Sequence, residues 1–234
     1  MIILNRNSKK LLLLQRNELL SKIQKNLKKK FGRFIFTNFL INFFVKKNIE
    51  NYAEKLFQNE INTLEKFLPK RANNIMDIGC GLGIINIFLN RLYKGKPNFF
   101  LLDKNKVDKK IVYGFSKNYE SYNHLNETTK ILLNNGLKKE QLNIFDVDKK
   151  IHIDKQMDLV ISLKSMGYHY PFENYLKLFK SCCNKDTIFI FDISIGTNNE
   201  YFFKKYFDEV RVFYEEPGIH YLKRIYCKFL KIRI

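Results

Sequence analysis

The chain has 234 residues, of which 45 % are hydrophobic and 15 % aromatic, and its formal net charge is +19. This length suits one α/β domain with an added segment, and the apolar content excludes an intrinsically disordered chain. The charge alone does not separate a selected nucleic-acid or membrane surface from compositional drift, because Lys, Asn, Ile and Phe are all abundant, as they are in AT-rich genomes.

Cysteine usage and hydropathy narrow the class further. Cys80, Cys182, Cys183 and Cys227 show neither the spacing of a metal site nor that of a small disulfide scaffold, so we expect reduced thiols and no metal. No apolar run reaches the roughly 18 residues of a membrane span, and no signal peptide is recognised. We therefore expect a cytoplasmic protein.

Residues 1–50 differ from the rest, because they hold twelve basic residues against two acidic ones. Leu13, Leu19, Leu20, Ile23 and Leu27 recur at helical spacing and predict a basic amphipathic helix over about 9–30. The apolar run 34–45 predicts either a helix over the following domain or an interfacial membrane helix. We expect 1–50 to be a helical extension that serves as lid or docking segment, and 51–234 to be the main domain.

Residues 50–70 predict an amphipathic helix, stopped by Pro69, whose inward side chains are Tyr52, Leu56, Ile61, Leu64 and Leu68. Tyr52 is expected either near a ligand or in packing.

A glycine-rich turn follows between an apolar run ending on Asp77 and a second apolar-periodic segment. Gly79, Gly81 and Gly83 stand at every second position, which is typical of a buried strand, a tight turn and a helix N-terminus. Glycine tolerates positive φ and lets a ligand touch the backbone, while the helix amides favour an anionic group. The dinucleotide fingerprint fails because Ile84 holds its sixth position, and no phosphate-loop Gly-Lys-Ser/Thr follows.

The motif Asp77-x-Gly79-x-Gly81-x-Gly83 resembles the first motif of the class I S-adenosylmethionine-dependent methyltransferases, and the resemblance runs from about Asn51 to the C-terminus. It implies a doubly wound, mostly parallel, seven-stranded sheet of Rossmann-like type and S-adenosylmethionine as cofactor. Asp103 ends the next apolar strand, 98–103, at the separation that brings a carboxylate to a ribose, and the family places its ribose-binding acid there. The cofactor-binding residues expected on this basis are Asp77, Gly79, Cys80, Gly81, Gly83, Asp103, Lys104, Asp146 and Ser162.

The later elements fit the same plan. Segments 141–147, 157–163 and 187–193 predict further strands, 123–135, 172–182 and 198–207 predict helices, and 209–230 predicts a terminal hairpin around Pro217-Gly218. Asp146 falls where many members bind adenine, with Asp148 as a rival. The loop Lys164–Pro171 leaves a strand carboxyl end, where ligands of open α/β sheets bind.

Methyl transfer to a hydroxyl needs a base, and His169 lies in that loop beside Tyr168 and Tyr170. We expect His169, with Tyr168, at the reacting group, and Asp192 to orient it or contact substrate; a histidine that only lines the pocket is the alternative. His220 could cap the pocket.

Two functions remain open. Ser162-Leu163-Lys164-Ser165 replaces the Asp/Asn-Pro-Pro-Tyr/Phe turn of exocyclic-amine methylases, which disfavours methylation of adenine in nucleic acid. The favoured function is O-methylation of a small molecule or sugar. In the alternative, the basic N-terminal segment docks on RNA or on an anionic membrane, and binding then falls steeply with salt.

Overall fold

The structure is a computed structural model that describes residues 1–43, 49–107, 123–166, 170–194, 200–216 and 222–231. Its centre is a seven-stranded sheet in the order β3-β2-β1-β4-β5-β7-β6. Strand β7 is antiparallel to both of its neighbours, β5 and β6, and all other neighbouring strands are parallel. The mostly parallel sheet and the terminal antiparallel hairpin are confirmed. The strands are β1 (Asn74–Ile78), β2 (Asn98–Asp103), β3 (Leu142–Asp146), β4 (Leu159–Ser162), β5 (Ile188–Ser194), β6 (Phe207–Glu216) and β7 (Leu222–Leu230).

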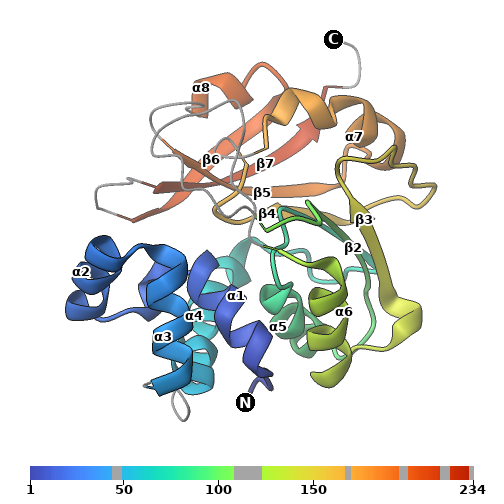
Figure 1. Cartoon of the computed structure of the whole chain (residues 1–234). Helices are drawn as coiled ribbons and strands as arrows, with labels where there is room; N and C mark the ends of the chain where they lie inside the picture. The colour runs from blue at the N-terminus through green and yellow to red at the C-terminus, as the bar shows by residue number, and fades with distance from the viewer. Residues whose placement is uncertain (44–48, 108–122, 167–169, 195–199, 217–221, 232–234) are drawn as a thin grey trace.

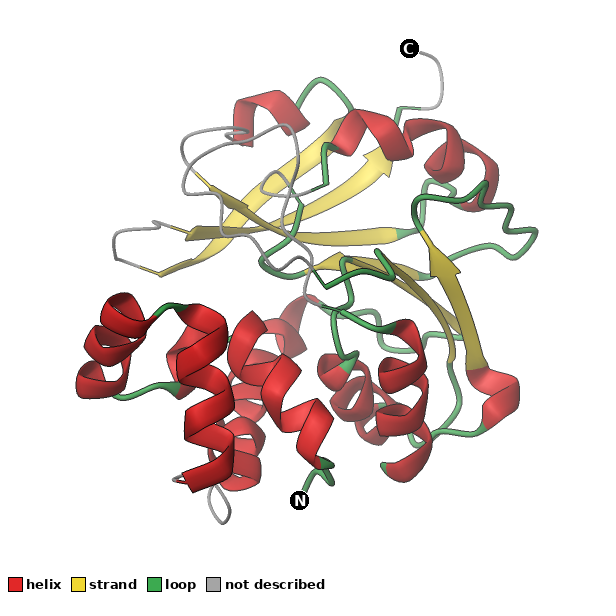
Figure 2. Ribbon diagram, viewed as in Figure 1, coloured by secondary structure: helices red, strands yellow, loops and turns green. Residues whose placement is uncertain are grey.

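Helices cover both faces of this sheet (Figures 1 and 2). On one face lie α1 (Arg6–Gln15), α3 (Arg33–Phe43), α4 (Ile49–Leu64), α5 (Ile84–Leu92) and α6 (Leu125–Asn134), with α2 (Lys22–Phe31) at their outer edge. On the other face lie α7 (Leu176–Cys182) and α8 (Glu200–Phe203). Short 3₁₀ helices occur at Asn17–Leu19, Glu65–Phe67, Lys139–Gln141 and Phe172–Tyr175.

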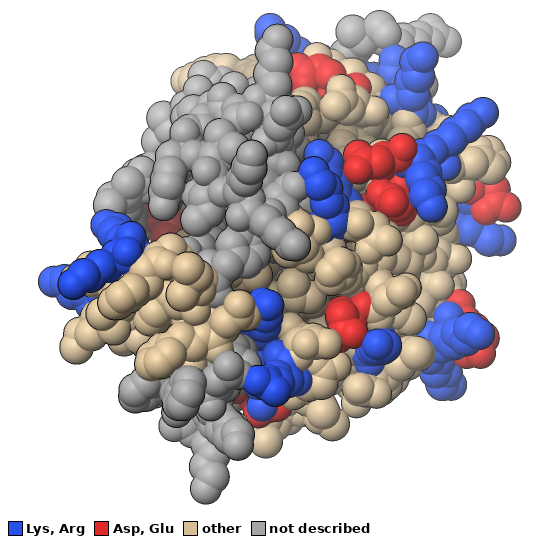
Figure 3. All heavy atoms as spheres, viewed as in Figure 1, with Lys and Arg blue, Asp and Glu red and all other residues tan. Residues whose placement is uncertain are grey.

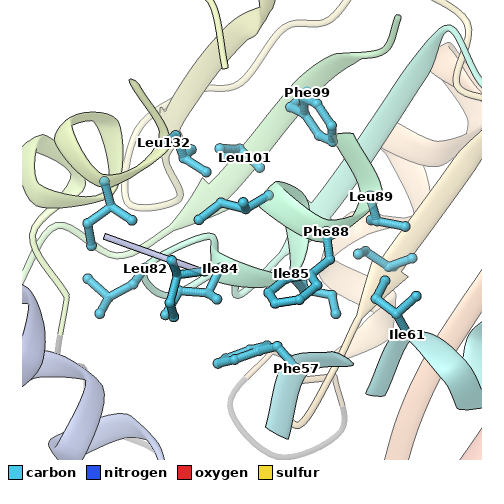
Figure 4. Close-up of a cluster of buried hydrophobic side chains, with 14 of the residues drawn as sticks. Phe57, Ile61, Leu82, Ile84, Ile85, Phe88, Leu89, Phe99, Leu101 and Leu132 are labelled. Carbon is cyan, nitrogen blue, oxygen red and sulfur yellow. The ribbon is translucent and has the colours of Figure 1, made fainter. Parts of the chain in front are cut away.

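Alternation along the strands divides the core into two. Phe99 and Leu101 of β2 belong to the cluster under α4, α5 and α6, whereas Phe100 and Leu102 belong to the cluster under α7 and α8. This follows from the strand period of two, and strands buried on both faces read as continuous apolar runs. Figure 4 shows the first cluster, in which Phe57 of α4 faces Ile85 and Phe88 of α5.

The N-terminal segment is not one helix over 9–30, so that prediction is wrong. α1 ends at Gln15, because the following Arg16 is extended with φ −121°, and α2 begins after Ser21. A capping box stabilises the new start, because the Gln24 amide donates to Ser21 Oγ and the Ser21 amide donates to Gln24 Oε1. Three residues of α1 also enter the core of the main domain: Leu11, Leu12 and Leu14.

The third helix, α3, lies on the same side of the sheet as α1 and packs against it. Phe36 and Leu40 of α3 are buried in a small cluster with Leu13 and Leu20. Across the described ranges, no helix combines the length and the apolar character that crossing a membrane requires.

The inward face of α4 also differs from the prediction. Ile61 and Leu64 are buried as predicted, but Tyr52 is 59 % exposed, so its inward orientation is wrong, and Ala53 and Phe57 are buried in addition. The buried Phe57 also lines the cavity that is described below.

Candidate functional site

The glycine-rich loop lies where β1 ends and α5 begins. The Gly79 amide donates to the Leu102 carbonyl oxygen at 2.7 Å, which fixes the loop beside β2. Gly79 has φ +71°, and a Cβ there would collide with the Cβ of Ser165 in the loop after β4. Glycine is therefore needed at this position both for its backbone angle and for close approach.

A cavity of about 240 Å³ opens above this loop, at the carboxyl ends of β1 and β2. Residues of the N-terminal segment and Phe57 of α4 border it as well. Its walls are Leu12, Gln15, Arg16, Phe57, Asp77, Gly79, Cys80, Gly81, Leu82, Ile84, Ile85, Asp103, Asn123, Leu163, Lys164, Ser165 and Tyr170.

Asp103, at the end of β2, accepts four hydrogen bonds. Its Oδ2 accepts from the Gly81 amide at 2.7 Å and from Asn123 Nδ2 at 3.1 Å. Its Oδ1 accepts from the Lys104 amide at 2.7 Å and from the Tyr170 hydroxyl at 2.5 Å. Burial raises the pKa of Asp103, and these hydrogen bonds oppose the rise. The carboxylate thus links the glycine loop to the loop after β4.

Asp77 lies beside it at the end of β1, 3 % exposed. Asn86 Nδ2 donates to Asp77 Oδ2 at 2.7 Å, while Asn86 Oδ1 is buried and accepts no hydrogen bond from the described residues. Burial raises the pKa of Asp77 to about 7, with the charge of Asp103 adding to the rise. The site therefore favours a cation next to Asp77.

Arg16 brings a positive charge to the same cavity from the end of α1. Its Nη2 donates to Glu60 Oε2 at 2.7 Å, and its guanidinium lies 4.7 Å from the centre of the Phe57 ring. Its Nη1 is buried, lies 3.5 Å from Glu18 Oε1 and makes no hydrogen bond within the described part of the chain. Burial acts to lower the pKa of Arg16, but Glu60 and Glu18 raise it overall, so the guanidinium stays charged.

The neighbouring Gln15 touches the glycine loop directly. Gln15 Oε1 accepts from the Leu82 amide at 3.3 Å, one residue before the N-cap of α5. A Cβ on Gly81 would lie 2.8 Å from that oxygen. An oxygen acceptor thus lies close to the N-terminus of α5, where helix amides favour negative charge.

Charged side chains tie the N-terminal segment to the strand ends. Lys164, in the loop after β4, pairs with Glu18, and its Nζ lies 3.4 Å from Glu216 Oε2 of β6. Arg16 and Lys164 both lower the pKa of Glu18 against the opposing effect of burial. The 3₁₀ turn after α1 and strand β6 therefore meet at Lys164, which lines the cavity.

A second cavity, of about 530 Å³, adjoins the first, and Tyr170 lines both. Val147 and Asp148, which follow β3, line it together with Lys104 and Tyr175. The Tyr170 side chain, hydrogen-bonded to Asp103, thus stands between two hollows along the strand ends.

The structure brings most of the sequence-predicted cofactor residues together. Asp77, Gly79, Cys80, Gly81 and Asp103 line the first cavity, Gly83 is the N-cap of α5, and Lys104 borders the second cavity.

Three of the predicted residues, Gly83, Asp146 and Ser162, line neither cavity. Ser162 Oγ donates to the Ile78 carbonyl oxygen at 2.7 Å and accepts from the Met166 amide, so it bridges two strand ends. Asp146 accepts from the Asp148 amide, and Asp148, the rival for the adenine role, borders the second cavity.

Of the predicted catalytic residues, the structure describes only Asp192. Tyr168, His169 and the pocket-capping His220 lie outside the described residues. Asp192 is fully buried and accepts two hydrogen bonds from Arg224 of β7, at 2.6 and 2.8 Å. Arg224 also donates to Thr63 of α4 at 2.6 Å. Asp192 therefore joins β5, β7 and α4, and it does not line either cavity.

Sequence reasoning missed Gln15, Arg16 and Asn123, and it noted Tyr170 only as a neighbour of His169. Asn123 Nδ2 also donates to the Gly81 carbonyl oxygen at 2.8 Å, so it holds the loop and Asp103 at once. No local pattern marks these residues, because their contacts span 20 to 67 positions of the sequence. Among the described residues, no group of three or more His, Cys, Asp or Glu is arranged to hold a metal ion.

No protein-family model and no curated protein matches the sequence. Among solved structures, the chain is similar to the S-adenosylmethionine-dependent methyltransferase SibL in its apo form, with TM-score 0.52 and 12 % identity over 89 % of this chain and 62 % of SibL. It is also similar to a proposed O-methyltransferase from Nostoc punctiforme PCC 73102, with TM-score 0.51 and 11 % identity over 74 % of this chain and 56 % of that one. The chain thus spans less than two thirds of either protein. It has the Rossmann-like fold of S-adenosylmethionine-dependent methyltransferases.

Proposed function

We propose that this chain is an S-adenosylmethionine-dependent methyltransferase that O-methylates a small molecule or a sugar. The observation that carries the proposal is the meeting of Asp77, the glycine loop and Asp103 around one cavity at the carboxyl ends of β1 and β2. Ligands of open α/β sheets bind in this crevice.

The polar groups of the cavity fit the amino-acid tail of the cofactor. Asp77 suits the ammonium, while Arg16 Nη1, buried and without a hydrogen bond among the described residues, suits the carboxylate beside the N-terminus of α5. The cofactor's sulfonium supplies the methyl group. The apolar side chains Leu12, Phe57 and Leu163 line the same cavity and would exclude water from the sulfonium.

The nucleoside half requires a change at Tyr170. Small-molecule sites usually measure about 300–1,000 Å³, and the first cavity alone is smaller than this range. We propose that the ribose hydroxyls replace the Tyr170 hydroxyl on Asp103, so that the adenine reaches the second cavity beside Val147 and Asp148.

We place the methyl acceptor beside the loop that follows β4. A neutral hydroxyl must lose its proton during transfer, and we propose His169, with Tyr168 beside it, as the group that receives this proton. Asp192 is not included, because Arg224 holds both of its oxygens. A small acceptor is favoured because the loop lacks the turn that holds an exocyclic base amine.

A macromolecular acceptor is the second candidate. The twelve basic residues within 1–50 favour RNA or an anionic membrane as a docking partner. Turnover of a small hydroxyl acceptor that does not depend on salt supports the first candidate, and binding to RNA that falls steeply with salt supports the second.

Titration calorimetry with S-adenosylmethionine and its demethylated product tests the cofactor site. We expect binding by the wild type, a loss of about 10- to 100-fold for Asp103→Ala, whose carboxylate holds the ribose, and a comparable loss for Gly81→Val. Asp154→Ala, which removes an exposed carboxylate elsewhere, should bind as the wild type does. His169→Ala should bind cofactor normally and lose turnover.

Two outcomes would count against the proposal. Normal cofactor binding by both Asp103→Ala and Gly81→Val would show that the site is elsewhere. Absence of binding by the wild type would show that S-adenosylmethionine is not its cofactor.

A further inference from the structure

The helix α2 carries an apolar stripe on its surface. Ile23, Leu27 and Phe31 follow one another at intervals of four residues, so they share one side of the helix. They are 73 %, 40 % and 53 % exposed, and none of the ten residues of α2 is buried. On the adjoining α3, Ile35 is 70 % exposed. A helix that shows its apolar side to solvent calls for a partner.

The remaining positions of α2 are strongly basic. The ten residues contain five lysines and no acidic residue: Lys22, Lys25, Lys28, Lys29 and Lys30. In Figure 3, basic side chains gather at the left edge of the molecule, where Figure 1 places α2, beside uncharged surface. Compositional drift toward lysine explains the charge, but it does not explain the regular apolar spacing.

The helix is already formed in the unbound chain. The capping box of Ser21 and Gln24 starts it, Gly32 with φ +82° ends it, and Lys28 donates to Asn17. A preformed docking element loses less conformational entropy on binding than a segment that must fold first.

We propose that α2 docks the protein on an anionic lipid bilayer. The stripe Ile23–Leu27–Phe31 enters the interfacial layer, and the lysines lie among the anionic headgroups. A short helix with a lysine-rich polar face and an apolar face of Ile, Leu and Phe has the character of an interfacial helix. The proposal does not rest on the methyltransferase activity.

Other partners fit the surface less well. RNA would neutralise the lysines but leave the apolar stripe in water. A second copy of α2 would bring five more lysines against the first five. The apolar run 34–45, which the sequence pointed to as the membrane contact, is less suited, because Phe36 and Leu40 are buried against α1.

The absence of tryptophan from the sequence provides a direct test. Phe31→Trp introduces a single reporter on the stripe, and Leu133→Trp introduces one at an exposed site of α6, 39 % exposed in the wild type. We expect the emission of Phe31→Trp to shift to the blue with vesicles of phosphatidylcholine and phosphatidylserine. Phosphatidylcholine alone should give little shift, and Leu133→Trp should not respond to either.

Substitutions then separate charge from apolar contact in a vesicle sedimentation assay. Lys25→Gln with Lys29→Gln should weaken binding to the anionic vesicles by roughly 30-fold, since each lysine near such a surface contributes about five-fold. Ile23→Gln should also weaken it, while the control Lys155→Gln with Lys185→Gln, both exposed elsewhere, should bind close to the wild type.

Three results would overturn the proposal. One is an unchanged Phe31→Trp spectrum with anionic vesicles. Another is equal loss for the control lysine pair, which would indicate net charge rather than α2. The third is a larger spectral change with RNA or with an acidic protein than with the anionic vesicles.

Discussion

The carboxylate of Asp103 shows how a single residue organises the site. Its four hydrogen bonds come from the adjacent Lys104 and from three residues that are distant in the sequence, Gly81 of the glycine loop, Asn123 and Tyr170. The Tyr170 ring meanwhile separates the two cavities. A ligand that offers hydroxyls to Asp103 therefore competes with a protein donor, so its affinity depends on the loop after β4 as well as on the acid.

Asp77 yields a prediction for the pH dependence of stability. Its pKa is about 7 in the folded chain and near 4 in the unfolded chain. Between these values the native state holds a proton that the unfolded state has released, so the contribution of Asp77 to stability is complete below about pH 4 and is lost as the pH rises through 7. Asp77→Asn, which stays neutral, should match the wild type near pH 4 and be more stable at pH 8 by up to about 4 kcal/mol.

Chemical denaturation at several pH values measures this difference. Asp154→Asn, at an exposed aspartate, should give no such trend. A difference between wild type and Asp77→Asn that stays constant from about pH 5 to pH 8 would contradict the raised pKa of Asp77.

At the scale of elements, α1 belongs to the site rather than to a separate lid. Its Leu12 and Gln15 line the cavity together with the C-cap residue Arg16, while Leu11, Leu12 and Leu14 enter the core beneath α5. The ion pair of Lys164 with Glu18 holds the following 3₁₀ turn against the loop after β4.

This arrangement predicts that Arg16 contributes selectively to ligands with an amino-acid tail. Arg16→Met should weaken binding of S-adenosylmethionine by about 10- to 100-fold, the usual worth of a hydrogen bond to a charged group. Binding of 5′-methylthioadenosine, which lacks the carboxylate, should change little. Calorimetry with both ligands measures the two effects, and Arg16→Lys should retain part of the affinity.

A purely structural role for Arg16 makes a different prediction. Loss of its contacts with Glu60 and Phe57 would weaken both ligands equally. Equal losses, together with normal binding of S-adenosylmethionine by the wild type, would therefore reject the role of Arg16 without rejecting the cofactor.

The strands were predictable because their signal is local. Segments buried on both faces form apolar runs, and the predicted 98–103 coincides with β2 (Asn98–Asp103). The glycine loop was equally local, since turn and helix start fall within a few residues.

What the sequence could not provide is set by contacts at long range. Asp192 resembled a strand-end acid, but β5 continues to Ser194, and Asp192 pairs with Arg224 across the antiparallel neighbour. Likewise, nothing near Arg16 in the sequence indicates that Glu60 and the cavity lie beside it. The glycine loop and the strand-end acid Asp103 are therefore more predictable than the residues that other elements bring to the cavity, such as Arg16.

At the scale of the whole molecule, the division at residue 50 does not coincide with a division of the core. Ile2, Leu4, Leu11, Leu12 and Leu14 belong to the same apolar cluster as β1, β2 and α5. Residues joined by one core are expected to unfold together. The N-terminal segment should then have no unfolding transition of its own.

Leu14 tests this cooperativity, because it is fully buried and does not line the cavity. Leu14→Ala should lower the stability of the entire chain by about 2–5 kcal/mol, and the melting temperature by about 2–4 °C per kcal/mol. Thermal unfolding followed by circular dichroism and by tyrosine fluorescence should show one shared transition in both proteins. Leu133→Ala, at a site 39 % exposed, should shift it far less. Two transitions, of which Leu14→Ala moves only one, would establish residues 1–50 as a separate folding unit and would make α1 a detachable lid.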